Sequence, residues 1–224
     1  MHQNKDNIMK SGWFKTFPKG VDVPGVREYR DEQEERETPD HLAGTVSYTI
    51  NEWGYRGSLI PQQGAPAAFG CSCTFGVGVS APWPSMLGVV NCGQPGASND
   101  KITRLAISYC ETFKPDTIYV MWTFWQRREW VNKDGYILSW RASRNFVGDD
   151  ESWADSHIAL MNEKWDEYNY DKNQLLLRSY CQLNNIKLIE TTVLDLDKDL
   201  YDLARDNMHP GPDWHLNVSA SLTT

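Results

Sequence analysis

The stretch AAFGCSCTFGVGV, Ala67–Val79, decides the fold and raises the question of function. A short apolar run ends at a glycine, and further glycines follow within a few residues, which is typical of a buried strand that ends in a tight turn. Ser72 lies in this turn between Cys71 and Cys73. Either the two cysteines are the functional groups, as reactive thiols or metal ligands, or Ser72 is, with the cysteines as small buried fillers. The remaining sequence distinguishes these two interpretations.

Short apolar runs typical of buried strands recur along the chain. They occupy residues 67–72, 87–90, 117–123 and 186–193. An earlier segment, residues 46–50, alternates apolar and polar side chains and also predicts a strand. Because helical patterns separate the later runs, the order of elements predicts an α/β fold, a parallel sheet covered by helices on both faces. Reactive groups of such sheets collect on the loops at the carboxyl ends of the strands, where Ser72 lies.

Two long helices are predicted between these strands. In residues 99–113, apolar side chains recur at helical spacing after Ser98 or Asn99, either of which can cap the helix. The second pattern starts near Ser152 and continues to about residue 185. Residues 124–151 are polar and aromatic without a clear period, so we expect an insertion over one rim of the domain.

The 224 residues predict one domain with an N-terminal appendage. Residues 1–64 form the predicted extension, which contains the early strand and a charged arm, residues 26–40, expected as a solvated helix or a loose segment. Residues 65–224 form the predicted domain. For the arm, three roles are open: it orders against the domain, pairs with a second copy as an oligomer contact, or stays loose.

Composition argues against several classes of function. The net charge of −8 and the isoelectric point near 5.1 lack the basic footprint of a nucleic-acid partner. No apolar run approaches the roughly 20 residues that cross a bilayer, and the first residues lack the apolar core of a secretory signal. The five cysteines, an odd number spread along the chain, indicate reduced thiols and favour synthesis in the cytoplasm. No cofactor is predicted, and the localisation is otherwise open.

Two further segments supply the partners of an acyl-transfer serine. Such a serine needs a base within hydrogen-bonding reach, a third group that orients the base, and N–H donors for the oxyanion. The segment DNMHPG near the end of the chain supplies Asp206 and His209, three residues apart, so that the carboxylate can orient the imidazole. The segment GQPGASN supplies a glycine loop in which the N–H of Gly96 can face the same cleft as the N–H of Ser72.

Together these segments resemble the SGNH (GDSL-like) hydrolase family. The resemblance rests on FGCSCTFG as the nucleophile block, NCGQPGASN as the glycine block and DNMHP as the terminal Asp-x-x-His block, and it covers the chain from Ala67 onward. It implies a flavodoxin-like three-layer α/β/α sandwich and ester hydrolysis through an acyl-enzyme. It also implies Ser72 as the nucleophile, His209 as the general base and Asp206 as its orienting partner. Gly96 and Ser72 would donate their N–H groups to the oxyanion.

Two positions depart from the family pattern. Cys71 stands where the family usually has an aspartate, which is not one of the catalytic groups. The third block, Gly-x-Asn-Asp, is replaced by MWTFWQRRE, so the asparagine that would give a third oxyanion donor has no counterpart. Thr123, Gln126 or Arg127 can replace this donor, and Arg127 would add a charge. Trp122, Gln126 and Arg127 are also expected to line the substrate side, with capping of the core as the alternative for such Trp and Arg side chains.

These residues predict a serine esterase that hydrolyses a small acyl ester, with an O-acetyl group on a carbohydrate as the expected substrate. The missing asparagine leaves a second interpretation, a weak or inactive SGNH-like module that binds a glycan. A third is a thiol-based metal or redox protein built on Cys71, Cys73 and Cys92. Their spacing lacks the paired cysteines of structural zinc sites, so no metal is predicted. We expect His215 to be a packing or capping residue.

Overall fold

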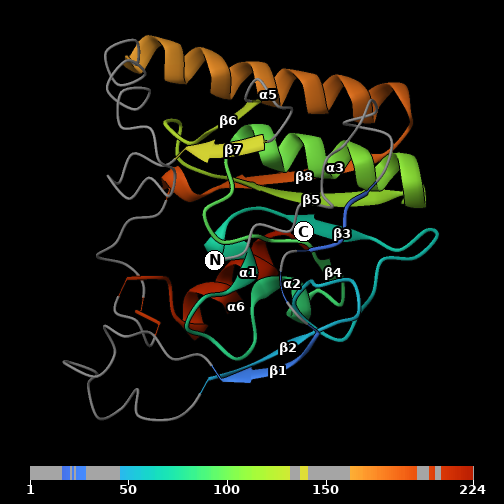
Figure 1. The fold of residues 1–224 in the computed structure, drawn as a ribbon, viewed down its shortest axis with the longest axis vertical. Helices are drawn as coiled ribbons and strands as arrows, with labels where there is room; N and C mark the ends of the chain where they lie inside the picture. Colours follow the sequence, from blue (N-terminus) through green and yellow to red (C-terminus); the bar gives the residue numbers. More distant parts are fainter. Residues whose placement is uncertain are drawn as a thin grey trace.

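The computed structural model describes residues 17–20, 22, 24–28, 46–131, 137–140, 162–195, 202–204 and 208–223. At its centre lies a four-stranded sheet in which every neighbouring pair of strands is parallel. The strands are, in spatial order, β4 (Val90–Asn91), β3 (Ala67–Phe69), β5 (Thr117–Trp122) and β8 (Lys187–Thr192) (Figure 1). Each strand overlaps an apolar run of the sequence, and all three residues of β3 are completely buried.

The order of the strands creates a place for a site. The chain passes from β3 outward to β4 and then crosses back to β5 on the other side of β3, which gives the order 2-1-3-4 of a flavodoxin-like sheet. Connections that leave β3 and β5 in opposite directions open a crevice beyond their carboxyl ends, where ligands of such sheets bind. Ser72 stands three residues after β3, and Thr123 follows β5 directly.

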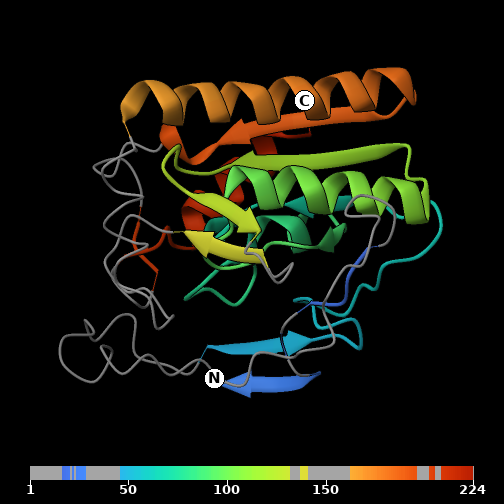
Figure 2. The same ribbon diagram turned by 45° about the horizontal axis from the view of Figure 1, so that its top comes forward.

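Helices cover both faces of the sheet (Figures 1 and 2). One face carries α3 (Asn99–Phe113) and α5 (Glu163–Leu183), which pack against each other. The other carries α1 (Ser72–Phe75), α2 (Trp83–Met86) and α6 (Pro212–Ser221), with α2 packed on α6. The helices divide in this way because crossovers between parallel strands are right-handed. A crossover toward one edge of the sheet therefore places its helix on one face, and a crossover toward the other edge places it on the opposite face. The predicted α/β fold is confirmed, and its two helical layers make it a three-layer sandwich.

The helix α3 illustrates how the sequence pattern becomes packing. Its first turn is capped by Ser98, whose hydroxyl oxygen accepts a hydrogen bond from the backbone N–H of Lys101 at 3.1 Å. The apolar residues at helical spacing, among them Ile102 and Tyr109, are buried against the sheet. The helix ends at Lys114, whose φ of 47° places it in the left-handed region. None of the described helices is long and apolar enough to cross a membrane.

The N-terminal extension joins the fold at two places. Strand β1 (Gly25–Glu28) pairs antiparallel with β2 (Ser47–Ile50), so the first residues of the charged arm form a strand, where a helix or a loose segment was predicted. The backbone of β2 supplies hydrogen-bonding partners that the composition of the arm does not reveal. Phe17 lies in the main core, where its ring meets Tyr109 at 5.0 Å and Phe113 at 5.8 Å. Residues 29–45 lie outside the described residues.

The described part of the rim insertion is a hairpin. Strand β6 (Arg128–Val131) pairs antiparallel with β7 (Ile137–Trp140) as a separate two-stranded sheet. Residues 132–136 and 141–161 lie outside the described residues, and with them the position near Ser152 at which the second helix was expected to begin. A continuous helix from there is wrong, because Asn162 has extended backbone angles and caps α5, which begins at Glu163. After α5 and β8, the short 3-10 helix η3 (Val193–Asp195) completes the central fold.

Candidate active site at the carboxyl ends of β3 and β5

The nucleophile turn places Ser72 at the first residue of α1. Cys71 has extended backbone angles and precedes the helix, so Ser72 sits directly above the end of β3, 7% exposed. Gly70 allows this close approach, because a Cβ atom there would lie 2.0 Å from Oγ1 of Thr74 and 3.0 Å from the carbonyl oxygen of Met121. The helix therefore starts almost in contact with β5, the strand next to β3.

The glycine loop packs directly against this turn. The backbone N–H of Gln94 donates to the carbonyl of Gly70 at 3.0 Å, and that of Gly93 donates to the side-chain oxygen of Asn91 at 3.0 Å. A Cβ atom on Gly93 would lie 2.4 Å from the backbone nitrogen of Phe75. The structure thus brings the first two sequence blocks together. Within the described part of the chain, the backbone N–H groups of Ser72 and Gly96 form no hydrogen bond, which leaves both available to an oxyanion.

Asn99 holds the residues that follow β5, Thr123 and Phe124, at the same edge of the sheet. Its side-chain oxygen accepts from the backbone N–H of Thr123 at 2.9 Å, and its amide group donates to the carbonyls of Thr123 and Phe124 at 3.1 and 3.4 Å. From the sequence, Asn99 is expected only as a helix cap. The 24 residues that separate it from Thr123 give no local signal of this contact.

Thr123, Arg127 and Cys71 form a polar cluster beside Ser72. The guanidinium of Arg127 donates to the hydroxyl oxygen of Thr123 at 3.0 Å, and its charge stacks 4.9 Å from the ring centre of Phe124. A hydrogen bond from Cys73, with Arg127 and Thr123 adding to it against the opposing effect of burial, holds the pKa of Cys71 well below its usual range.

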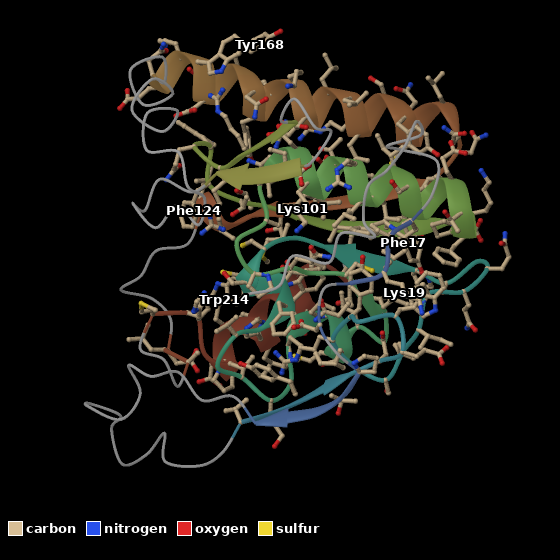
Figure 3. The ribbon with its side chains drawn as sticks, in the orientation of Figure 1. Phe17, Lys19, Lys101, Phe124, Tyr168 and Trp214 are labelled. Carbon is tan, nitrogen blue, oxygen red and sulfur yellow. The ribbon has the colours of Figure 1, made fainter. Side chains whose placement is uncertain are left out.

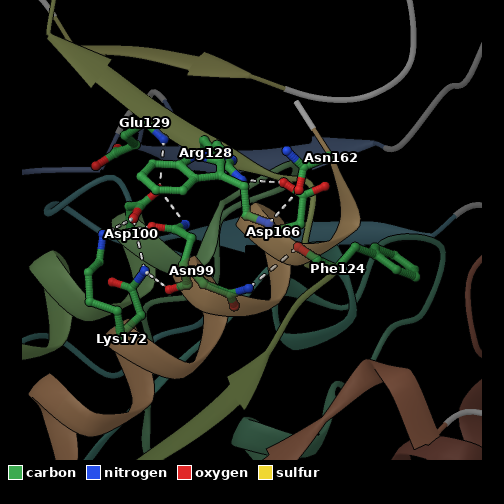
Figure 4. A network of polar contacts seen from close by, with 11 residues as sticks. Asn99, Asp100, Phe124, Arg128, Glu129, Asn162, Asp166 and Lys172 are labelled. Carbon is green, nitrogen blue, oxygen red and sulfur yellow. Dashed lines mark hydrogen bonds and ion pairs between the residues drawn. The ribbon is translucent and has the colours of Figure 1, made fainter. Parts of the chain in front are cut away.

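A network of ion pairs fixes the segment that follows Arg127 (Figure 4). Arg104 of α3 holds both carboxylate oxygens of Glu129 at 2.8 and 3.0 Å. Arg128 pairs with Asp166 at the beginning of α5. Asp100 accepts hydrogen bonds from the backbone of Glu129 and from side chains of α5. These contacts attach the start of the β6–β7 hairpin to both α3 and α5. The residues that follow Arg127 are therefore held in place.

His209 lies in the loop before α6. It is half-buried, and its carbonyl accepts a hydrogen bond from the backbone N–H of Ala204 at 2.8 Å. The loop is fixed by Asp202, whose carboxylate accepts from the first N–H groups of α6, those of Asp213 and Trp214. Figure 3 shows Trp214 and Phe124 toward the same side of the molecule, the side on which the parallel strands end. Asp206 lies outside the described residues, so its role beside His209 stays a prediction.

His215 is a buried packing residue, in agreement with its expected role. Its side chain is completely buried, and Nδ1 accepts a hydrogen bond from the backbone N–H of Trp83 at 3.2 Å. Burial, with smaller contributions from Arg56 and His209, lowers the pKa of His215 from 6.5 to about 3. The imidazole is therefore neutral at physiological pH and joins α6 to α2.

The prediction that Trp122 lines the substrate side is wrong. Its side chain is 1% exposed, its indole N–H donates to Glu190 of β8 at 2.9 Å, and its ring contacts Tyr170 of α5. Successive strand residues point to opposite faces, so Trp122 belongs to the core under α5. The next aromatic residues, Phe124 and Trp125, are 36% and 39% exposed. Gln126 is half-buried in the same turn.

The thiols do not assemble a metal site. All five cysteines are free and buried. Within the described residues, no group of three or more His, Cys, Asp or Glu side chains is placed to hold a metal ion.

Comparison with known proteins gives one structural likeness. No protein-family model matches the chain, and no curated protein matches it. Among solved structures, the chain is similar to LAE5, an alpha/beta hydrolase enzyme from the metagenome of Lake Arreo, Spain, with 14% sequence identity over 70% of this chain and 93% of that chain and a TM-score of 0.32.

Proposed function

We propose that the protein is a serine hydrolase of the SGNH type, which cleaves a small acyl ester through an acyl-enzyme. The observation that supports this proposal most is the meeting of three distant segments at the point where the strand order reverses. Ser72 at the start of α1, the loop of Gly93–Gly96 and the segment from Thr123 to Arg127 lie at the same edge of the sheet. Such an edge is where α/β sheets bind ligands.

The proposed chemistry uses groups of this chain alone. The hydroxyl oxygen of Ser72 attacks the ester carbonyl while His209 takes its proton and then transfers it to the leaving alcohol. The N–H groups of Ser72 and Gly96 hold the oxyanion, and Asp206 orients His209. A water molecule, activated by His209, then attacks the acyl-enzyme, releases the acid and regenerates Ser72.

A carbohydrate ester fits the surroundings of this serine. Phe124 and Trp125 expose aromatic surface next to the segment that ends β5. Aromatic faces of this kind contact the apolar faces of sugar rings, and the polar rim insertion begins at the same place. We therefore propose an O-acetyl group on a carbohydrate as the substrate of the esterase.

The first test is covalent labelling with a fluorophosphonate probe, followed by peptide mapping. We expect labelling at Ser72, its loss in Ser72→Ala and at least a 100-fold slower rate in His209→Ala, because the serine is activated by the base. Ser80→Ala is the matched control, since Ser80 lies eight residues further on an exposed loop, and it should label like the natural protein. Unchanged ester hydrolysis in folded Ser72→Ala and His209→Ala would reject the assignment.

A second function, a glycan-binding module without turnover, is favoured by one observation. The hydroxyl of Thr123, a candidate for the missing oxyanion donor, is engaged with Arg127 and Cys71. Removal of one oxyanion donor costs about 10²–10³ in turnover. Binding of acetylated glycans on an array, without labelling of Ser72 and without release of acetate, would support the module. Rapid release of acetate would reject it.

A further inference from the structure

Within the described part of the chain, Arg127 has no carboxylate partner, unlike the neighbouring Arg104 and Arg128. Arg104 is paired with Glu129, and Arg128 is paired with Asp166, both through side chains that are mostly buried. Among the residues that the structure describes, no carboxylate oxygen lies within 4.0 Å of the Arg127 guanidinium. The side chain of Arg127 is half-buried, and its described contacts are the hydroxyl of Thr123 and the ring of Phe124. A partly buried cation without a counter-charge favours an anionic ligand.

The position of this charge relates it to the reacting group. Arg127 donates to Thr123, Thr123 contacts the thiol of Cys71, and the Sγ atom of Cys71 lies 4.0 Å from the Oγ atom of Ser72. The charge also acts on both thiols that flank the serine. These contacts link Arg127 to Ser72, so a group bound by Arg127 lies at the same edge of the sheet as an acyl chain attached to Ser72.

The guanidinium keeps donors for a ligand. Arginine has five N–H donors in a planar fork, and the hydrogen bond to Thr123 at 3.0 Å uses one of them. The ring of Phe124 lies against the guanidinium, 4.9 Å from its central carbon, and restricts its orientation. The edge that remains matches the two oxygens of a carboxylate, which arginine binds in a bidentate manner.

We propose that Arg127 selects esters whose acyl part carries a carboxylate. This inference rests on the proposed function, because it names the acyl group that Ser72 accepts. Arg127 binds the free carboxylate of a short dicarboxylic half-ester and aligns the ester carbonyl with Ser72. The charge-assisted pair favours such an ester over its neutral equivalent by roughly 10- to 100-fold in kcat/KM.

The test compares two esters that differ only in this group, 4-nitrophenyl hemisuccinate and 4-nitrophenyl butyrate, which have acyl chains of equal length. We expect a hemisuccinate-to-butyrate ratio of kcat/KM well above one, which falls as salt is raised. In Arg127→Gln the ratio should fall about 10- to 100-fold, mainly through KM, and Arg127→Lys should restore part of it, because the charge returns without the fork. Arg178→Gln is the matched control, since Arg178 is an exposed arginine on α5 that pairs with Glu190 of β8. The hemisuccinate-to-butyrate ratio of this variant should stay unchanged.

The outcomes separate this inference from the function on which it rests. Labelling of Ser72 and hydrolysis of both esters with a ratio near one, or a high ratio that survives Arg127→Gln, overturns the role of Arg127 and leaves the esterase standing. Hydrolysis of neither ester together with no labelling of Ser72 overturns both.

Discussion

At the scale of single residues, two glycines decide how closely the nucleophile helix approaches the sheet. Gly70 and Gly93 both pack against the second half of α1, at Thr74 and Phe75, and at both positions a Cβ atom would fall within 2.5 Å of another heavy atom. For Gly93 that atom is the backbone nitrogen of Phe75, which no change of side-chain rotamer can move. The position of Ser72 therefore depends on residues that have no chemistry of their own.

Gly93→Ala should destabilise the fold and displace Ser72. Overpacking of this kind typically costs about 1–3 kcal/mol in the free energy of unfolding, which urea denaturation measures. The rate of fluorophosphonate labelling should fall as well, because α1 has to shift. Gly88→Ala is the control: a Cβ atom there meets nothing within 4 Å, and its φ of +68° limits the cost to about 1–2 kcal/mol of backbone strain. Equal labelling of the two variants would contradict the proposed packing.

His215 should make stability depend on pH below neutrality. Its pKa is about 3 in the folded protein and near 6.5 in the unfolded chain, so between these values the unfolded state binds the extra proton. The contribution of His215 to the free energy of unfolding is fully present above pH 6.5. It decreases by about 1.4 kcal/mol per pH unit as the pH falls toward 3. From pH 7.5 to 5.5, the free energy of unfolding measured with urea should fall about 1 kcal/mol less in His215→Asn than in the natural protein. Asparagine retains an acceptor for the backbone N–H of Trp83. An identical loss in both proteins would contradict the buried, neutral imidazole.

At the scale of elements, the edge of the sheet is fixed by contacts between segments that are far apart in the sequence. Asn99 opens α3 and holds the residues that follow β5. Arg104 and Asp100, on the same helix, hold the start of β6. The segment that carries Arg127 is therefore anchored at both ends by α3, and its geometry depends on that helix more than on its own sequence.

Asn99→Ala should weaken both stability and reactivity. It removes two buried hydrogen bonds to Thr123 and a partly buried one to Phe124 and leaves backbone groups unpaired, which costs about 1–3 kcal/mol. Labelling of Ser72 should slow, because Thr123 and Arg127 lose their support. Asn162→Ala removes the cap of α5, costs about 1 kcal/mol, and should leave labelling unchanged. If both variants slow labelling in proportion to their loss of stability, Asn99 has only a structural role.

The elements themselves could be predicted from the sequence where a local period exists. Strands β3 and β5 lie in mostly apolar runs, and α3 carries an apolar stripe behind a capping serine. The strand β1 could not be predicted, because its charged residues pair with a backbone that lies about twenty residues further along the chain. The catalytic roles of the site residues stay predictions, but the segments that meet at this edge of the sheet were predictable from their motifs. The inward side chain of Trp122 and the unpaired charge of Arg127 were not, because both depend on what neighbouring elements supply.

At the scale of the whole molecule, the N-terminal extension supports the loop that follows the nucleophile helix. Arg56 is buried, and its guanidinium donates to the carbonyls of Phe75, Gly76, Val79 and Ser80. Its charge lies 4.1 Å from the ring centre of Tyr48, whose hydroxyl accepts from the N–H of Gly78 at 2.6 Å. Burial lowers the pKa of Arg56 to about 10, so the carbonyls and rings have to compensate the cost of a buried cation. The predicted division at residue 64 therefore separates residues that share one core.

A chain that begins at residue 63 should consequently fail to fold cooperatively. It lacks Phe17, which stacks on Tyr55 and contacts Phe113, and it lacks Arg56, which holds the loop after α1. Phe17→Ala alone should cost about 3–5 kcal/mol, the range for a buried aromatic ring, whereas Phe17→Leu should cost less than half of that. Thermal unfolding followed by near-ultraviolet circular dichroism measures both effects. A truncated chain that melts cooperatively within a few degrees of the full chain would show that residues 1–62 are an appendage, and the core contacts of Phe17 and Arg56 would then contribute little to the free energy of folding.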